Sequence, residues 1–572
     1  MEKHWNIKTP DTDLVTRLSR SLQCHPITAA LLINRNIQSE KEASEFLNVS
    51  LNNLRSPFDL KDMESAVERI YKAITHHENI LLFGDYDVDG VTSTAILMDF
   101  LGCIGANVTA YIPHRLKEGY GLQTTHITHL ARPNKIDLVI TADCGSTNFD
   151  AVAKARELGI DVIITDHHNI GKKIPPALAV INPKRHDCTA GLDNLAGVGV
   201  AFTLIICLRK YLRDKHFWEN QNEPNLKTLC DLVALGTVAD MVPLIQENRI
   251  FSKTGLDIIN TNCRTGVKAL LHAAGVEEKS ADEQDIAFRL APRLNAAGRM
   301  AHASIAVDLL TTTDMQRAAE IAQSLNGYNH QRRELENKII SDIQRFLTQE
   351  PRILERKTLV LWDYKWHEGV LGIVASRMAE KYHRPVVLIA VKDQICKGSA
   401  RSIPGLDLYK RLSACGPALE KFGGHSMAAG LSIAPANLEP FRIRFEDVVS
   451  ECLSPDDLVP QLIVDQELKF EEISERLIDE IESLAPFGTG NPEPVFISRK
   501  VGVASSKIVG GHHRRMVLTQ AGKSNTKKIN AIQFNAVTAL PLKDAFDKIA
   551  FKIRWNRWRG SQTAQLVIED VQ

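Results

Sequence analysis

Residues 78 to 168 alternate short apolar runs with longer helical segments, and this alternation limits the possible folds more than any other feature of the 572-residue chain. The runs ENILLFG, NVTAYIP, KIDLVITAD and IDVIITDHH are typical of strands, and VTSTAILMDFLGCIG and AVAKARELG are typical of helices. Apolar strands that alternate with helices indicate a parallel, doubly wound sheet. The sequence therefore predicts an α/β domain here.

Metal-ligand residue types follow three of these predicted strands. They are Asp85, Asp87 and Asp89 after the first, Asp143 after the third, and Asp166, His167 and His168 after the fourth, with Asp240 at a later helix end. Open α/β sheets bind ligands at the carboxyl ends of their strands. Neighbouring carboxylates raise one another's pKa, and a bound metal ion ordinarily stabilises such a cluster. Oxygen ligands with one or two imidazoles favour manganese or magnesium over zinc, so we predict a binuclear hydrolytic site.

These residues also have interpretations other than a metal site. The spacing from Asp85 to Gly90 resembles the start of an EF-hand loop, but that loop needs a glutamate where this chain has Ile96. Asp89 could cap the following helix, which is compatible with metal binding. A His-His pair is more often structural, but its place beside two other acidic strand ends favours function. For Asp240 alone, the sequence favours neither a structural nor a functional role.

The rest of the chain shows four further compositional segments. Residues 1 to about 75 are predicted to form small helices, and residues 310 to 350 a long helix that ends before Pro351. A second α/β unit then runs to about 450, and short strands and turns from about 458 indicate a small β-barrel. We expect domains at 1–75, 76–310, 311–351 (a connecting helix), 352–455 and 456–572.

The net charge of zero, with 69 basic and 69 acidic residues, hides a local polarity. Residues 499–560 contain 14 Lys and Arg against 2 Asp and Glu, whereas residues 451–498 contain 2 against 12. A basic terminal segment favours a polyanionic partner. Within it, FKIRWNRWRG alternates cations with apolar and aromatic residues. On a strand, that pattern suits either a groove for single-stranded nucleic acid or a barrel core that is filled by the tryptophans.

Several classes of protein are disfavoured. The ten cysteines include no C-x-x-C pair, which indicates reduced thiols in the cytoplasm and disfavours a disulfide framework or a zinc site. The longest apolar run, residues 198–208, is too short to span a bilayer, and the first residues lack the apolar region of a signal peptide. We expect a cytoplasmic protein with no membrane partner.

The motifs in their order resemble those of a known family. GDYDVDG, TADCG, TDHH and GTVAD are similar to the four motifs of the DHH phosphoesterases. RLAPRLNAAGRM, WHEGVLGIVASR, GSARSIPGLDLY and KFGGHSMAAG resemble further motifs of the RecJ branch, which comprises single-stranded-DNA exonucleases. The resemblance runs from about Trp5 to the end of the chain. It implies a parallel-sheet DHH domain, a long helix, a smaller α/β DHH-associated domain and an OB-type β-barrel.

The resemblance also implies metal ligands. Two divalent ions, manganese or magnesium, would be held by Asp85, Asp87, Asp89, Asp143, His167 and Asp240. Asp87 would bind one ion and Asp89 the other, with Asp143 between them. His167 and Asp240 would complete the second ion, and Asp85 would support the first directly or through another ligand. His168 would face the phosphate and stabilise the transition state or protonate the leaving oxygen.

Further residues are implied to bind the substrate. Gly423, Gly424 and His425 would touch the scissile phosphodiester, although adjacent glycines are also typical of a tight turn. Arg115, Ser399 and Arg401 resemble the family's pocket for a 5′-terminal phosphate. Asn295 and Arg299 could contact the substrate or brace a domain interface.

The function implied by the resemblance is metal-dependent 5′→3′ exonuclease activity on single-stranded DNA, with release of 5′-mononucleotides during recombination and repair. A single-strand-binding protein and a helicase are implied partners of a monomeric enzyme. Two alternatives remain: a DHH phosphodiesterase for short oligonucleotides, cyclic dinucleotides or pyrophosphate, and a non-catalytic single-strand-binding scaffold. The basic terminal segment argues against the first, and the intact ligand set argues against the second.

Overall fold

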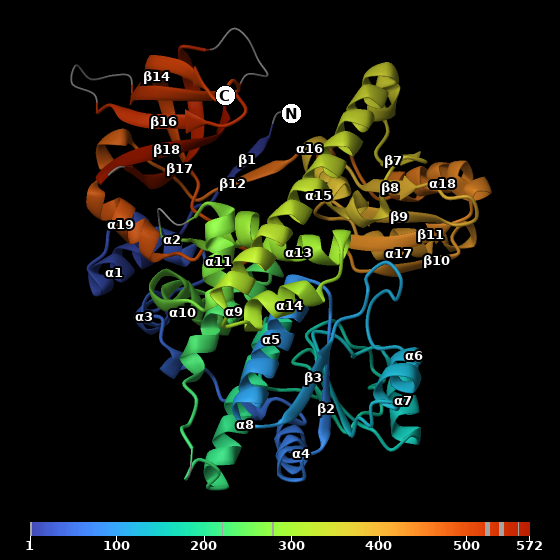
Figure 1. The fold of residues 1–572 in the computed structure, drawn as a ribbon. Coiled ribbons are helices and arrows are strands. Elements are labelled where there is room, and N and C mark those ends of the chain that lie inside the picture. Colours follow the sequence, from blue (N-terminus) through green and yellow to red (C-terminus); the bar gives the residue numbers. More distant parts are fainter. Residues whose placement is uncertain (1–2, 220, 277–279, 521–526, 537–542, 559) are drawn as a thin grey trace.

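The computed structural model describes residues 3–219, 221–276, 280–520, 527–536, 543–558 and 560–572. The chain forms two α/β units joined by a long helix, and a β-barrel near the C-terminus (Figure 1). The predicted fold class is therefore confirmed. No helix among the described residues is both long and apolar enough to cross a membrane.

The first sheet is parallel throughout, with the strand order β3-β2-β4-β5-β6. Alternate residues of β2 enter different cores, since Ile80 and Leu82 pack on one face and Leu81 and Phe83 on the other. Burial on both faces explains why the strand is an unbroken apolar run. The strands are β2 (Asn79–Gly84), β3 (Asn107–Tyr111), β4 (Leu138–Ala142), β5 (Asp161–Thr165) and β6 (Ala179–Ile181).

Helices cover both faces of this sheet and continue into a helical layer beside it (Figure 1). The predicted helices after β2 and β4 are present as α5 and α7. The helices are α4 (Met63–Thr75), α5 (Val88–Cys103), α6 (Thr124–His126), α7 (Phe149–Glu157), α8 (Gly197–Asp214), α9 (Cys230–Ala239), α10 (Gln246–Asn262), α11 (Thr265–Ala274), α12 (Glu283–Asp285), α13 (Ala291–Met300) and α14 (Ser304–Thr311).

A 35-residue helix, α15 (Met315–Gln349), leads from this layer to the second α/β unit. The second sheet has the order β10-β11-β9-β8-β7, in which only the β7–β8 pair is parallel. Its elements are β7 (Leu359–Asp363), α16 (Leu371–Tyr382), β8 (Val386–Ala390), β9 (Cys396–Arg401), α17 (Leu408–Ser413), β10 (Lys421–Gly424), β11 (Ala428–Ile433) and α18 (Leu438–Ser450).

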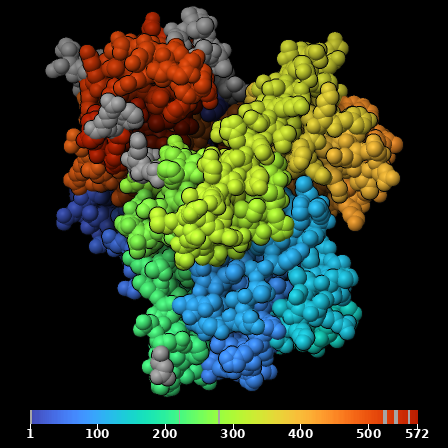
Figure 2. All heavy atoms as spheres, in the orientation of Figure 1, coloured from blue at the N-terminus to red at the C-terminus, as the bar shows by residue number. Residues whose placement is uncertain are grey.

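The C-terminal barrel closes because β14 pairs with both β15 and β17, around the order β14-β15-β16-β18-β17. Its strands and the adjoining elements are β12 (Gln461–Val464), β13 (Gln466–Glu467), α19 (Glu475–Ser483), β14 (Phe496–Val509), β15 (His513–Gln520), β16 (Ile529–Gln533), β17 (Ala545–Trp558) and β18 (Ser561–Val571). The surface is hollowed between the barrel, in red, and α15, in yellow (Figure 2).

The first 50 residues belong to the barrel's surroundings. Helices α1 (Thr12–Leu22), α2 (Pro26–Ile33) and α3 (Glu40–Leu47) share one apolar core with the barrel, in which Leu31 and Leu32 lie with Phe551. The sequence predicted only helices here, but β1 (His4–Ile7) is a strand that pairs in parallel with β12. A four-residue strand whose partner lies more than 450 residues away has too little local pattern to be predicted.

Candidate functional site

The site lies where β2, β4 and β5 end side by side, as the sequence predicted from its strand-end residues. The loop after β2 is fixed by Asp87, whose Oδ1 accepts hydrogen bonds from the amides of Asp89 (3.1 Å) and Gly90 (3.2 Å) at the start of α5. The helix cap is therefore Asp87 rather than Asp89. Gly90 is required because a Cβ there would lie 2.5 Å from the Asp85 carbonyl oxygen.

Asp89 turns back into the domain and meets another helix. Its carboxylate accepts hydrogen bonds from the Gly197 amide (2.6 Å) and the Val198 amide (2.8 Å), at the first turn of α8. Backbone amides and the positive end of the helix dipole favour a negative charge there. Burial and then the charge of Asp87 nevertheless raise the pKa of Asp89 to about 7. The two amides fix the orientation of the carboxylate without neutralising it.

Asp143 lies at the centre of the cluster, after β4. Its backbone is left-handed, with φ of +64°, a conformation that Asp and Asn tolerate better than most residues. Gly197 has no side chain where a Cβ would lie 2.5 Å from Asp143 Oδ1. Burial and then the charge of Asp89 raise the pKa of Asp143 well above its usual value. A buried carboxylate with such neighbours is stable only with a proton or a cation.

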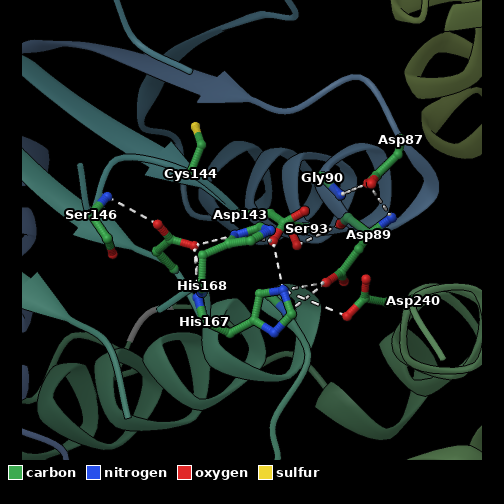
Figure 3. A network of polar contacts seen from close by, with 12 residues as sticks. Asp87, Asp89, Gly90, Ser93, Asp143, Cys144, Ser146, His167, His168 and Asp240 are labelled. Atoms are coloured by element: carbon green, nitrogen blue, oxygen red, sulfur yellow. Dashed lines mark hydrogen bonds and ion pairs between the residues drawn. The ribbon is translucent and has the colours of Figure 1, made fainter. Parts of the chain in front are cut away.

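His167 points toward three carboxylates at once (Figure 3). Its Nε2 lies 3.2 Å from Asp143 Oδ1, 3.5 Å from Asp240 Oδ2 and 3.8 Å from Asp89 Oδ2. Neither ring nitrogen forms a hydrogen bond with the described residues. Burial and then His168 lower the pKa of His167 to about 3, so the ring is neutral at physiological pH. A neutral imidazole with an unused nitrogen is the form that binds metals.

His168 has the opposite charge state. Burial opposes its protonation, but a 2.8 Å hydrogen bond from Nδ1 to Asp166 Oδ1 outweighs burial and raises the pKa of His168 to about 9. Asp166 also accepts hydrogen bonds from the amides of Ser146 (2.9 Å), His167 (2.8 Å) and His168 (3.0 Å), which lower its own pKa despite burial. Asp166 thus holds His168 as a cation beside the metal ligands.

One residue near His168 was missed from the sequence. The hydroxyl of Tyr120 lies 3.1 Å from His168 Nδ1 and 3.3 Å from the Asp143 carbonyl oxygen, and the two rings meet edge to face. Tyr120 is flanked by Gly119 and Gly121, which have φ of +81° and +79°. A tyrosine between two glycines in a loop after a strand was the available signal.

The donor set fits two divalent ions that share Asp143. Three groups of side chains bring their ligand atoms within 4.8 Å of one another, namely Asp85–Asp87–Asp143, Asp89–His167–Asp240 and Asp143–His167–His168. Buried Asp85 Oδ1, Asp143 Oδ1 and His167 Nε2 have no hydrogen-bond partner among the described residues. Burial and then Asp89 raise the pKa of Asp240 to about 9. Oxygen-rich sets with one imidazole suit manganese or magnesium.

Three arginines with Ser399, named here the arginine pocket, adjoin this cluster through Arg115, whose guanidinium lies 4.7 Å from the centroid of the Tyr86 ring. Arg401 from β9, Arg299 from α13 and Arg115 from the loop after β3 lie near one another, with Ser399 Oγ 3.3 Å from an Arg401 nitrogen. Burial and then Arg115 lower the pKa of Arg299 to about 9. In the described part of the chain, no carboxylate lies within 4 Å of these three guanidinium groups. A cluster of cations without acidic partners is suited to an anion.

Asn295 and Arg299 both have bracing contacts. Asn295 Oδ1 accepts a hydrogen bond from the Val88 amide (3.2 Å), which fixes the acidic loop after β2. An Arg299 nitrogen donates to the carbonyl oxygen of Gly369 (2.8 Å), just before α16 in the second α/β unit. Arg299 therefore joins the two units and also lines the arginine pocket.

The two glycines of KFGGHSMAAG lie in β10, in a hairpin with β11 where Gly423 pairs with Gly430 and Gly424 with Ala429. The glycines are therefore strand residues, and the tight turn follows them, closed by a hydrogen bond from the His425 amide to the Ala428 carbonyl oxygen (2.8 Å). His425, at the end of the hairpin strand, lies near His168, whose charge lowers the pKa of His425 after the larger effect of burial. The turn and the position beside the site are compatible.

The basic strand FKIRWNRWRG, which lies mostly in β17, does not form an open groove. Phe551 and Ile553 are buried in the barrel core, and the Trp555 indole donates to Asp479 (2.8 Å). Lys552 and Arg554 both pair with Glu493. The tryptophans do not fill the core: Trp555 is only partly buried at its edge, and the side chain of Trp558 lies outside the described residues. Its basic face is neutralised by the acidic segment before it.

Another face of the barrel carries unpaired charge that the sequence analysis did not single out. Lys507 of β14 lies directly opposite Arg515 of β15, and Arg515 lies opposite Ile532 of β16. Like charges directly opposite one another destabilise a sheet. Among the described residues, no carboxylate lies within 4 Å of either cation. His513 and the half-exposed ring of Phe534 are in contact on the same side, with ring centroids 5.0 Å apart.

The comparisons with known proteins agree with this geometry. Residues 79–237 match the DHH family N-terminal domain, residues 355–451 match the DHHA1 domain, and residues 464–570 match the RecJ OB domain. The sheet edge with its metal ligands and these matches define a phosphoesterase of the DHH class.

Relatives that match nearly the whole chain identify the family within this class. The chain is 36% identical to the single-stranded-DNA-specific exonuclease RecJ of Salmonella typhimurium over the whole of both chains, and 37% identical to that of Escherichia coli over 96% of each. The crystal structure of RecJ in complex with Mn²⁺ from Thermus thermophilus aligns with a TM-score of 0.84 at 29% identity, over the whole of this chain and 79% of the other. The chain belongs to the RecJ family of single-stranded-DNA-specific exonucleases.

Proposed function

We propose that this protein is a metal-dependent exonuclease that degrades single-stranded DNA from its 5′ end and releases 5′-mononucleotides. The observation that carries the proposal is the arginine pocket, which has no acidic partner among the described residues and adjoins the buried cluster of carboxylates and His167 through Arg115. A terminal phosphate in that pocket would place the next phosphodiester at the metal ligands. The curated relatives are named as single-stranded-DNA-specific exonucleases.

The metal ligands divide into two sets. Asp85, Asp87 and Asp143 would hold one ion, and Asp89, His167 and Asp240, together with Asp143, the other. When bound, two manganese or magnesium ions supply Lewis-acid polarisation of the phosphoryl group and lower the pKa of water. Asp143 would serve both sets because its Oδ1 lies 3.2 Å from His167 Nε2 and its carboxylate also belongs to the group with Asp85 and Asp87.

His168 would act on the phosphate itself. As a cation held by Asp166, it can donate a hydrogen bond to a phosphate oxygen as negative charge develops there, or transfer a proton to the leaving oxygen. When the bond to the 3′ oxygen of the first nucleotide breaks, that nucleotide leaves with its 5′-phosphate. The remaining strand then has a new 5′-phosphate, which fits the same arginine pocket in the next turn.

The barrel would hold the strand beyond the site. The cations Lys507 and Arg515, with the rings of His513 and Phe534, combine the charge and stacking surfaces that single strands use. We further propose that the protein acts as a cytoplasmic monomer in recombination and repair, together with a helicase and a single-strand-binding protein. The ten unpaired cysteines support a reducing compartment.

Three substrates test the proposal. The protein in manganese is given a long 5′-phosphorylated single strand, bis-p-nitrophenyl phosphate and pyrophosphate, and the products are identified. We expect 5′-mononucleotides from the single strand and little turnover of the small substrates. Comparable or faster hydrolysis of the small substrates would favour a small-substrate phosphodiesterase. Tight binding of the strand without hydrolysis in any divalent metal would favour a scaffold.

A further inference from the structure

Helix α16 contacts the arginine pocket through Ser376. Arg401 Nε donates a hydrogen bond to Ser376 Oγ (2.9 Å), and Ser376 Oγ donates to the carbonyl oxygen of Gly372 one turn earlier (3.1 Å). The hydroxyl therefore accepts one hydrogen bond and donates one, so its rotation is fixed. Neither Ser376 nor Gly372 was singled out from the sequence.

These contacts orient the guanidinium group of Arg401. Its Nη1 donates to the Ala400 carbonyl oxygen (2.8 Å) and lies 3.3 Å from Ser399 Oγ, while Nε is held by Ser376. Nη2 forms no hydrogen bond with the described residues. Burial and then Arg115 lower the pKa of Arg401, because no acidic partner compensates the two cations. A planar guanidinium held on one edge presents its other edge in a fixed direction.

Gly372 keeps the space around that open edge free. A Cβ at this position would lie 2.9 Å from Arg401 Nη2 and 3.0 Å from Ser399 Oγ. Glycine near the start of a helix lowers helix stability relative to alanine, so its presence needs a reason. Room for Nη2 and Ser399 supplies one.

Ion pairs with α15 fix the position of α16. Arg377, next to Ser376 in α16, pairs with Glu336 Oε2 (3.1 Å), and Arg332 pairs with Glu336 Oε1 (2.8 Å). Glu336 is fully buried on α15, and its carboxylate makes no other hydrogen bond with the described residues. A buried carboxylate between two arginines fixes where α16 lies relative to the connecting helix.

We propose that Ser376 and Gly372 are positioning residues that make α16 a determinant of specificity for a 5′-terminal phosphate monoester. Ser376 aims Arg401, and Gly372 leaves its open nitrogen and Ser399 accessible to the extra charged oxygens that a monoester has and a 5′-hydroxyl lacks. The inference rests on the proposed action at 5′ ends, and it adds residues outside the motif GSARS.

The test compares two oligonucleotides that differ only in a 5′-phosphate or a 5′-hydroxyl. The readouts are kcat/KM in manganese and equilibrium Kd in EDTA, each expressed as the ratio between the two oligonucleotides. We expect Ser376→Ala to reduce both ratios by about tenfold, since a charge-assisted hydrogen bond is lost. Ser376→Thr, which keeps the hydroxyl, should restore them, and Gly372→Ala should reduce them further.

Ser413→Ala is the matched control. Ser413 is also an exposed helical serine in this α/β unit whose hydroxyl donates to the carbonyl oxygen four residues earlier (2.8 Å), but it forms no hydrogen bond with an arginine of the described residues. Its ratios should equal those of the wild type. The proposal is overturned if Ser376→Ala affects both oligonucleotides equally or leaves the ratios unchanged. The Kd ratio remains informative if hydrolysis is absent, so failure of the exonuclease proposal and failure of this one are distinguishable.

Discussion

Replacement of Asp143 by Asn should have opposite effects on protein stability in buffers without metal and in buffers with manganese. In EDTA the variant should be more stable than the wild type, because it removes a buried charge that has carboxylate neighbours. In manganese it should be less stable, because the shared ligand is lost. Asn keeps the volume and tolerates the left-handed backbone at φ of +64°.

The magnitude follows from the position of Asp143 in two of the three ligand groups. A ligand at 100 times its Kd stabilises the folded state by about 2.7 kcal/mol, so two ions give about 5 kcal/mol. A domain of this size gains roughly 2–4 °C per kcal/mol, so manganese should raise the wild-type melting temperature by about 10–20 °C. The variant should gain less than about half of that. Turnover should fall about 10³-fold, equivalent to about 4 kcal/mol of transition-state stabilisation.

The assay is thermal unfolding in EDTA and in manganese at pH 5.5 and pH 8. Because the folded-state pKa of Asp143 is raised, the wild type without metal loses stability as pH rises above the usual carboxyl pKa of about 4. The advantage of the variant in EDTA should therefore be larger at pH 8. Asp231→Asn is the control. Asp231 is buried but paired with Arg264 (2.9 Å), so this replacement should lower the stability of the protein in both buffers. An Asp143→Asn protein that is less stable than the wild type in EDTA, or that keeps the full manganese shift, would refute the reasoning.

Three further outcomes follow from the structure. His167→Gln should weaken manganese binding in calorimetry and regain some activity in excess metal, whereas His168→Gln should lower turnover with metal affinity retained; equal losses of affinity would mean that both residues are ligands. Lys507→Gln and Arg515→Gln should each reduce the salt dependence of single-strand binding by about 0.7 in log–log slope, while Lys552→Gln, whose amine pairs with Glu493 and Glu569, should not. Arg249→Met should lower the free energy of unfolding by about 3 kcal/mol in denaturant titrations, because the buried guanidinium donates to the carbonyl oxygens of Phe46, Ser483 and Leu484; a change below about 1 kcal/mol would show that these contacts contribute little.

The strand ends were the most predictable part of the molecule. Continuous apolar runs before Asp85, Asp143 and Asp166 fix both the strands and the edge at which they end, so the cluster follows from local patterns. The charge states of His167 and His168 do not follow. They depend on the burial of each ring and on which of the two rings forms a hydrogen bond with Asp166, and adjacent letters in a motif do not reveal either.

The barrel shows a different limit. Alternation along β17 predicts two faces but does not say which one is buried or what covers the other. Phe551 faces the core, and Arg554 meets Glu493, which lies 61 residues earlier. Arg499, Lys552, Arg554 and Arg557 of the basic segment pair with Glu467, Glu482 and Glu493 of the acidic segment. Lys507 of β14 and Arg515 of β15 have no carboxylate within 4 Å among the described residues. Charge counts predict the net charge of a segment but not which residues pair with its charged side chains.

The shared core of α1 to α3 and the barrel has a consequence for synthesis. Ile27 and Leu32 share one core with residues as late as Leu566 and Ile568, so this core is complete only when almost the whole chain has been made. At roughly 5–20 residues per second, that wait lasts about half a minute to two minutes. Products that end before β18 would leave this core incomplete, and they would be the first forms that chaperones hold and proteases remove.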